Sequence, residues 1–208
     1  KRCVFSCLHK ADSFYVRVVK NHLRPELTEM LTDDDKIYEM FSEYADAIRF
    51  YQDSRISMFA LYGLEDKIKE ALSKKVWLSC GGYLIIEPTE ALTVIDVNSG
   101  KTGKSQNKLS SEEFHHRVNC CAVPEIMRQL RLRNLSGIII VDMLKTGKDN
   151  AEILLSMMER EAAKDSVDTV IVGMTALGLV EITRKKTEAS LYEKIKNIPD
   201  AKEHENET

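Results

Sequence analysis

Residues 91–100 read ALTVIDVNSG, and residues 137–142 read GIIIVD. Each stretch is a short apolar run that leads to a carboxylate, Asp96 in the first and Asp142 in the second. Short runs rich in Val and Ile predict buried strands. An ionised Asp at the end of a buried strand costs free energy unless a cation meets it. The two stretches therefore predict two strands of one sheet whose ends share a cationic ligand.

The segments around these stretches alternate between strand and helix patterns. Ser110 and Glu113 fit a capping box at a helix start, and apolar residues at three- and four-residue spacing follow them; we expect Gly137 to end this helix. The other elements that we expect are strands at 13–19, 76–78, 83–86, 169–172 and 179–183, and helices behind Asp33–Asp35, over 64–72 and from Asp149. This alternation predicts an α/β layered fold.

The two strand ends predict a metal site. Side chains at i and i+2 of a strand project to the same side, so Asp96 and Asn98 can face one point. If the strands are neighbours, Asp142 approaches Asp96, and at about 4 Å and an effective dielectric near 20 the carboxylates repel by roughly 4 kcal/mol. Bound Mg²⁺ or Mn²⁺ removes this repulsion, and both ions prefer oxygen ligands. In the alternative interpretation, each Asp only caps the loop or helix that follows its strand.

Composition excludes several classes of protein. The formal net charge of −3 argues against a general polyanion binder, so any nucleic-acid contact must come from local patches. Five cysteines form an odd set without a C-x-x-C pair, which argues against a disulfide scaffold or a self-contained zinc site and favours the reducing cytoplasm. We see neither a secretory leader nor an apolar run long enough to cross a bilayer, so we expect no membrane partner.

Three blocks resemble the catalytic core of the RNase E/G family of bacterial endoribonucleases. They are GGYLIIEPTEALTVIDVNS at 81–99, RQLRLRNLSGIIIVD at 128–142 and GLVEITRK at 178–185. The resemblance spans most of residues 60–187 and is weaker before them. It implies a DNase I-like catalytic subdomain at 74–187, preceded by an RNase H-like mixed α/β segment at 1–73. We expect the remainder, 188–208, to be a charged and partly disordered tail.

The resemblance also implies roles for individual residues. The positions that match Asp96 and Asp142 hold a catalytic Mg²⁺ in the family, and the position of Asn98 assists them. In that family, a hydroxide generated near the metal attacks a phosphodiester of single-stranded RNA and leaves a 5′-phosphate. The resemblance thus implies a metal-dependent endoribonuclease that takes part in RNA processing or decay.

Six basic residues are candidate contacts for RNA phosphates. In the alternative interpretation, they belong to an ordinary solvated surface. Arg128 and Arg131 lie three residues apart on the predicted helix, and the other four lie in loops near the presumed metal: Lys101, Lys104, Lys145 and Lys148.

The chain also departs from the family pattern. Lys145 stands where a carboxylate is usual, and Ala176 stands where an Arg is usual. The zinc-link cysteines that join two subunits in many members have no counterpart here, so a homo-oligomer would need another interface. These departures keep two alternatives open, a catalytically impaired RNA-binding or assembly module of the same fold and, less favoured, a metal phosphoesterase acting on a small nucleotide.

Overall fold

The computed structural model describes residues 16, 29–41, 48–100 and 110–196. The chain divides into two compact units, residues 1–66 and 67–208. Lys101 and Lys104 lie outside the described residues. So does the strand predicted over 13–19, apart from Val16, which is helical. Among the described residues, no helix is both long and apolar enough to cross a membrane.

The first unit contains a small strand–helix–strand arrangement. Strands β1 (Met30–Thr32) and β2 (Ile48–Phe50) pair in parallel, and α2 (Asp35–Phe41) lies between them in the sequence. Asp34 starts α2, because its Oδ1 accepts a hydrogen bond of 3.0 Å from the backbone N–H of Ile37. The helix predicted behind Asp33–Asp35 is thereby confirmed. A short helix, α3 (Met58–Leu61), follows.

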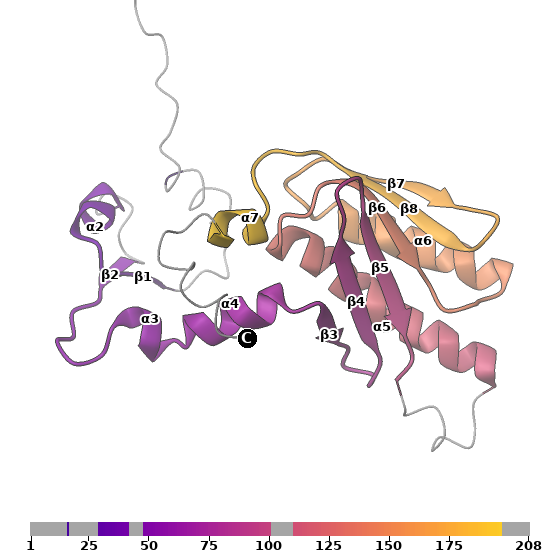
Figure 1. Cartoon of the computed structure of the whole chain (residues 1–208), viewed down its shortest axis with the longest axis horizontal. Helices are drawn as coiled ribbons and strands as arrows, with labels where there is room; N and C mark the ends of the chain where they lie inside the picture. Colours follow the sequence, from indigo (N-terminus) through magenta and orange to yellow (C-terminus); the bar gives the residue numbers. More distant parts are fainter. Residues whose placement is uncertain (1–15, 17–28, 42–47, 101–109, 197–208) are drawn as a thin grey trace, which may run out of the picture. The chain divides into compact units, whose positions relative to one another are not determined.

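The second unit is built on a six-stranded mixed sheet (Figure 1). The strands, in spatial order, are β3 (Lys75–Trp77), β4 (Tyr83–Pro88), β5 (Thr93–Asn98), β6 (Gly137–Asp142), β8 (Leu179–Arg184) and β7 (Thr169–Met174). Within this described sheet, β5 and β6 are parallel and the other pairs are antiparallel. Helix α4 (Leu64–Leu72) begins in the last residues of the first unit and ends in the second. The described helices that lie wholly in the second unit are α5 (Ser111–Leu132), α6 (Lys148–Ala162) and α7 (Leu191–Lys196). The predicted α/β fold class is confirmed.

Helices α5 and α6 lie together on one face of the sheet (Figure 1). Along β5 the buried residues are Thr93, Ile95 and Val97, which alternate with side chains that are exposed or half-buried. Ile95 and Val97 pack with apolar side chains of α5 and α6, such as Ile126 and Met158, in a single core. The alternate residues of β5 therefore project from the opposite face, which we call the open face.

The start of α5 follows the prediction, but its end does not. Ser110 Oγ accepts from Glu113 N at 3.2 Å, and Glu113 Oε2 accepts from Ser110 N at 2.8 Å, which completes the capping box. These bonds hold the pKa of the Glu113 carboxyl below its ordinary value. The expectation that Gly137 ends the helix is wrong, because α5 stops at Leu132. Asn134 turns the chain with a φ of 48°, a left-handed conformation that Asn tolerates better than most residues.

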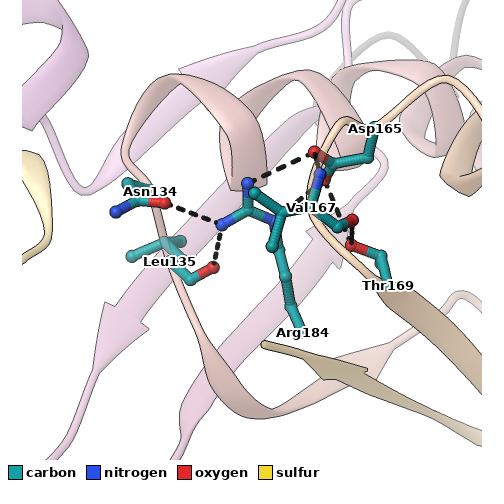
Figure 2. A network of polar contacts seen from close by, with 6 residues as sticks. All are labelled: Asn134, Leu135, Asp165, Val167, Thr169 and Arg184. Carbon is teal, nitrogen blue, oxygen red and sulfur yellow. Dashed lines mark hydrogen bonds and ion pairs between the residues drawn. The ribbon is translucent and has the colours of Figure 1, made fainter. Parts of the chain in front are cut away.

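A buried ion pair joins the end of β8 to two neighbouring connections (Figure 2). Arg184 Nε lies 2.8 Å from Asp165 Oδ2, and the two side chains are 3% and 1% exposed. Arg184 Nη1 also donates to Asn134 Oδ1 and to the carbonyl of Leu135, each at 2.9 Å. The network therefore connects the segment after α6, the turn after α5 and the last residue of β8.

Helix α7 lies inside the segment that was expected to be a charged tail. A second capping box starts it: Ser190 N donates to Glu193 Oε2 at 2.7 Å, and Glu193 N donates to Ser190 Oγ at 3.2 Å. The backbone N–H of Leu191 donates to the carbonyl of Arg133 at 2.9 Å. The start of α7 is thereby attached to the turn that follows α5.

Candidate metal centre

Asp96 and Asp142 are direct partners in the parallel pairing of β5 with β6. Neighbouring strands lie about 4.8 Å apart, and paired residues project from the same face of a sheet. The condition set in the sequence analysis, that the two strands are neighbours, is therefore met. Asp142 is the last residue of β6, and Asp96 lies two residues before the end of β5. Both belong to the open face, where Asp96 is half-buried and Asp142 is exposed. Two carboxylates thus converge where an α/β sheet most often binds ligands.

Asn98 belongs to the same cluster. Its Nδ2 donates a hydrogen bond of 2.7 Å to Asp96 Oδ2. This bond occupies one carboxylate oxygen and restricts rotation of the Asp96 side chain. The i, i+2 prediction for these two residues is confirmed, since both project from the same side of β5 and touch each other.

Two glycines shape the backbone around Asn98. A Cβ added to Gly82 would lie 2.7 Å from the carbonyl oxygen of Asn98, and one added to Gly100 would lie 2.4 Å from the carbonyl oxygen of Gly81. Gly100 also has a φ of 69°. Any larger residue at these positions would have to displace the strand end that carries Asn98.

The available side-chain ligands suit Mg²⁺ better than a metal ion whose ligands must all come from the protein. Within the described residues, no group of three or more His, Cys, Asp or Glu side chains could hold a metal ion. Mg²⁺ commonly uses one or two carboxylates, and phosphate and water complete its octahedral shell. Asp96 and Asp142 supply two carboxylates at an open position, so these residues fit such an ion.

The loop after β6 is fixed by the first half of α5. Asn119, which is fully buried, donates from Nδ2 to the carbonyl of Leu144 at 2.8 Å and accepts from its N–H at 3.1 Å. Glu112 Oε1 accepts from Gly147 N at 3.1 Å, and His115 Nδ1 lies 3.2 Å from the carbonyl of Lys145. Sequence reasoning missed these residues. Their helical spacing, with a polar Asn amid apolar positions, was the available signal.

Of the predicted RNA contacts that the structure describes, two follow Asp142 within six residues of the chain and two lie in the last part of α5. Lys145 is exposed three residues beyond Asp142, and Lys148 is the exposed first residue of α6. Arg128 and Arg131 lie in the last part of α5, on the covered side of the sheet. Arg128 follows Asn119, whose side chain holds the loop after β6, by nine residues on α5. At a rise of about 1.5 Å per residue, Arg128 lies roughly 13 Å along the helix axis from this loop contact. Arg128 Nη2 also pairs with Glu125 at 2.8 Å.

A cavity of about 630 Å³ lies at the other end of the sheet. Its lining includes Thr93 and Gly137, which begin β5 and β6, together with the cationic side chains of Lys74, Arg133 and Lys186. The two carboxylates lie at the opposite ends of these strands. The candidate metal centre is therefore on the open face and separate from this cavity.

Comparison with known proteins gives a single family. The profile described as "Ribonuclease E/G family" matches residues 1–187. The chain belongs to the Ribonuclease E/G family. The resemblance drawn from the three sequence blocks is therefore confirmed, and the match extends into the N-terminal part, where the resemblance was weaker.

Three relatives show how much of a family member this chain covers. It is 38% identical to Ribonuclease G of Escherichia coli (strain K12) over 183 residues, which are 84% of this chain and 37% of that protein. It is 34% identical to Ribonuclease E of Nostoc sp. over 199 residues, 89% of this chain and 28% of the relative. The identity to Ribonuclease G of Haemophilus influenzae is 41% over 155 residues, 74% of this chain and 30% of the relative. The chain thus spans about a third of the length of these relatives.

Proposed function

We propose that this chain is the catalytic region of a Mg²⁺-dependent endoribonuclease that cleaves single-stranded RNA and leaves 5′-phosphate ends. The observation that carries the proposal is the direct pairing of Asp96 with Asp142 at the carboxyl ends of two parallel strands, with Asn98 bonded to Asp96. Relatives named Ribonuclease G and Ribonuclease E support an RNA substrate. Mn²⁺ is the alternative cofactor, and the cytoplasm is the proposed location.

The same proposal covers the finer fold assignment. The mixed sheet with two helices on one face is the part that we assign to a DNase I-like catalytic subdomain. We assign the segment that contains β1, α2 and β2 to an RNase H-like subdomain.

Each residue of the candidate centre has a distinct task in this function. Mg²⁺ held by Asp96 and Asp142 would neutralise negative charge on the scissile phosphate and favour deprotonation of the attacking water. Asn98 keeps Asp96 in one orientation through its 2.7 Å hydrogen bond. Without a cation, Asp96 and Asp142 repel each other, so the pair attracts a divalent ion when phosphate approaches.

Substrate binding depends on the surroundings of the two carboxylates. The open face is a surface rather than a closed pocket, which suits a polymeric strand better than a small nucleotide. Lys145 and Lys148 are exposed and follow Asp142 in the chain, and in this proposal they pair with RNA phosphates. The buried Asn119 holds the loop that carries Lys145, so phosphate contacts there would be preorganised.

One observation favours a second candidate, an RNA-binding or assembly module without turnover. The exposed Lys145 lies three residues beyond Asp142, and an ammonium group near a carboxylate attracts it electrostatically, as a metal ion does. Lys145 could therefore compete with Mg²⁺ for Asp142. In this candidate function, RNA would bind but would not be cut.

Cleavage of a labelled single-stranded RNA in the presence of Mg²⁺ tests both candidates. The wild-type chain should cut the RNA, EDTA should stop the reaction, and Asp142→Asn should abolish it while thermal unfolding is unchanged. Asp168→Asn is the matched control, because Asp168 is exposed and precedes β7 at the opposite end of the sheet. Binding without cleavage would support the RNA-binding module, and wild-type cleavage by the Asp142→Asn protein would refute the assigned centre.

A further inference from the structure

A cluster of one lysine and two aromatic residues lies at the edge of the sheet. The ring centroids of Trp77 on β3 and Tyr83 on β4 are 5.4 Å apart, in an edge-to-face arrangement. The Nζ atom of Lys75 lies 3.9 Å from each centroid. Two cation–π contacts therefore hold the ammonium group between two rings. We call these three residues the aromatic clamp.

The strand register places the aromatic clamp on the same face as the two carboxylates. Tyr83 pairs with Asn98 across β4 and β5, and Trp77 pairs with Tyr83 across β3 and β4. Directly paired residues project from the same face of a sheet, so this series leads from Asn98 to Trp77 on the open face. At about 4.8 Å per strand, Tyr83 lies one strand from Asn98 and Trp77 lies two strands away, roughly 10 Å.

Trp77 leaves much of its indole in contact with solvent. Its side chain is 65% exposed, whereas Trp is usually largely buried in folded proteins. Lys75 covers part of one face of the ring, and the rest of the indole is accessible. A large exposed aromatic surface beside a fixed cation is the combination with which proteins bind single-stranded nucleic acid, because bases stack on the ring and phosphates pair with the cation.

We propose that the aromatic clamp is a base-stacking subsite for single-stranded RNA. One base would stack on Trp77, with Tyr83 supporting the ring and Lys75 pairing with a neighbouring phosphate. Asp96 lies two residues further along β5 and Asp142 one strand beyond it, so Trp77 is roughly 12 Å and 16 Å from these two residues. These spans correspond to about three to five nucleotides, given the ~3.4 Å spacing of stacked bases. The stacked base therefore lies a few nucleotides from the phosphate that Asp96 and Asp142 would hold. This inference rests on the proposed function, because that function supplies the RNA strand.

The clamp is better suited to RNA than to an apolar protein partner. Lys75 places a positive charge at its centre, and burial of an ammonium group against an apolar surface is costly. An RNA strand supplies both the negative charge for Lys75 and the flat ring for Trp77. The series of paired residues on the open face also connects the clamp directly to the candidate metal centre, as a continuous strand of substrate requires.

Fluorescence can test this subsite directly, because Trp77 is the single tryptophan of the 208 residues. The 208-residue Asp142→Asn protein in EDTA is titrated with a single-stranded RNA of about 12 nucleotides, within the usual site sizes of single-strand binders. Stacking should quench the Trp77 emission along the same curve as the anisotropy of labelled RNA. A duplex of the same sequence should not quench it.

Substitution then separates stacking from general binding. Trp77→Ala should weaken RNA binding about fivefold or more, the effect expected for one base stacked on an aromatic ring, and Trp77→Phe should restore most of the affinity. Val172→Ala is the matched control, since Val172 is 57% exposed at the other edge of the sheet. An abasic nucleotide at one position of the RNA should weaken binding to wild type but not to Trp77→Ala. Melting curves check that each variant is folded.

The results distinguish this inference from the proposed nuclease activity. RNA that binds without quenching, or with an affinity that Trp77→Ala changes less than twofold, would overturn the subsite even if the wild-type protein cleaves RNA. Failure of the RNA to bind at all would overturn it as well. Quenching, together with loss of affinity in Trp77→Ala, would uphold the subsite even if the wild-type protein with Mg²⁺ does not cleave RNA, a result that would refute the nuclease.

Discussion

The buried ion pair of Arg184 and Asp165 gives the sharpest prediction about stability. Replacing Arg184 by Met removes hydrogen bonds to both Asp165 oxygens, at 2.8 Å and 3.3 Å. Among the described residues, Asp165 then keeps the bonds from Val167 N and Thr169 Oγ1, and the carbonyl of Leu135 loses a donor. Removal of one partner of a buried ion pair costs about 3–5 kcal/mol, so we expect a loss of that size in the free energy of unfolding.

Urea denaturation at pH 7, followed by circular dichroism, measures this loss. The matched control is Arg128→Met, because the ion pair of Arg128 with Glu125 lies on the surface, with side chains 56% and 21% exposed. Surface pairs contribute about 1 kcal/mol or less, so this variant should unfold almost like wild type. Arg184→Lys keeps the charge and loses the forked geometry, and it should fall between the two. Equal unfolding free energies for Arg184→Met and Arg128→Met would refute the argument.

The pH dependence supplies a second readout for the same variant. Burial by itself raises the pKa of Asp165, but hydrogen bonds from Arg184 and Val167 outweigh it and hold the pKa below its ordinary value. The stabilisation is therefore complete above the unfolded pKa of about 3.9 and is lost as pH falls through the lower folded pKa. In Arg184→Met, burial dominates and protonation of Asp165 relieves an unpaired charge. The difference between wild type and variant should thus shrink as pH falls from 7 to about 4.

Three further changes test the candidate centre. Asn119→Ala removes both hydrogen bonds to Leu144, so urea denaturation should show a loss of about 1–3 kcal/mol in the free energy of unfolding. Steady-state cleavage should show a higher KM for RNA, and an unchanged KM would contradict the positioning role of Asn119. Gly82→Ala brings a Cβ to 2.7 Å from the carbonyl of Asn98, so cleavage should need more Mg²⁺, read from activity against metal concentration. Lys145→Asp changes the local charge by two, which at high dielectric changes the electrostatic free energy of Mg²⁺ binding by about 1–2 kcal/mol. Calorimetry should therefore show Mg²⁺ binding about tenfold tighter, and RNA binding should be weaker. Unchanged affinities would mean that Lys145 is an ordinary solvated side chain.

The sequence predicted the parts of the centre that depend on local periodicity. Two-residue alternation placed Asp96 and Asn98 on one side of a strand, and they hydrogen-bond at 2.7 Å. The capping box at Ser110 was also readable, because its two residues contact each other within one helical turn. The adjacency of β5 and β6 was a conditional expectation, since strand order is decided by long-range packing.

Features that depend on tertiary contacts were not predictable in the same way. Val76-Trp77-Leu78 has the pattern of an ordinary strand, and nothing local indicates that Trp77 lies on the open face. The role of Asn119 depends on a loop that lies 25 positions further along the chain. Helix α7 has a capping signature at Ser190 and Glu193, but its six residues are too few to produce a clear apolar periodicity.

The parallel pairing of β5 with β6 has a consequence for folding kinetics. Parallel neighbours need a long crossover, and here the crossover contains the 22 residues of α5. The carboxylates of Asp96 and Asp142 thus converge only after a long loop has closed, one of the slower events in the folding of a small domain. An unfolded or partly synthesised chain has no paired carboxylates to offer a divalent ion. Mg²⁺ should therefore bind the native state alone, slow its unfolding and raise its melting temperature in proportion to the logarithm of metal concentration.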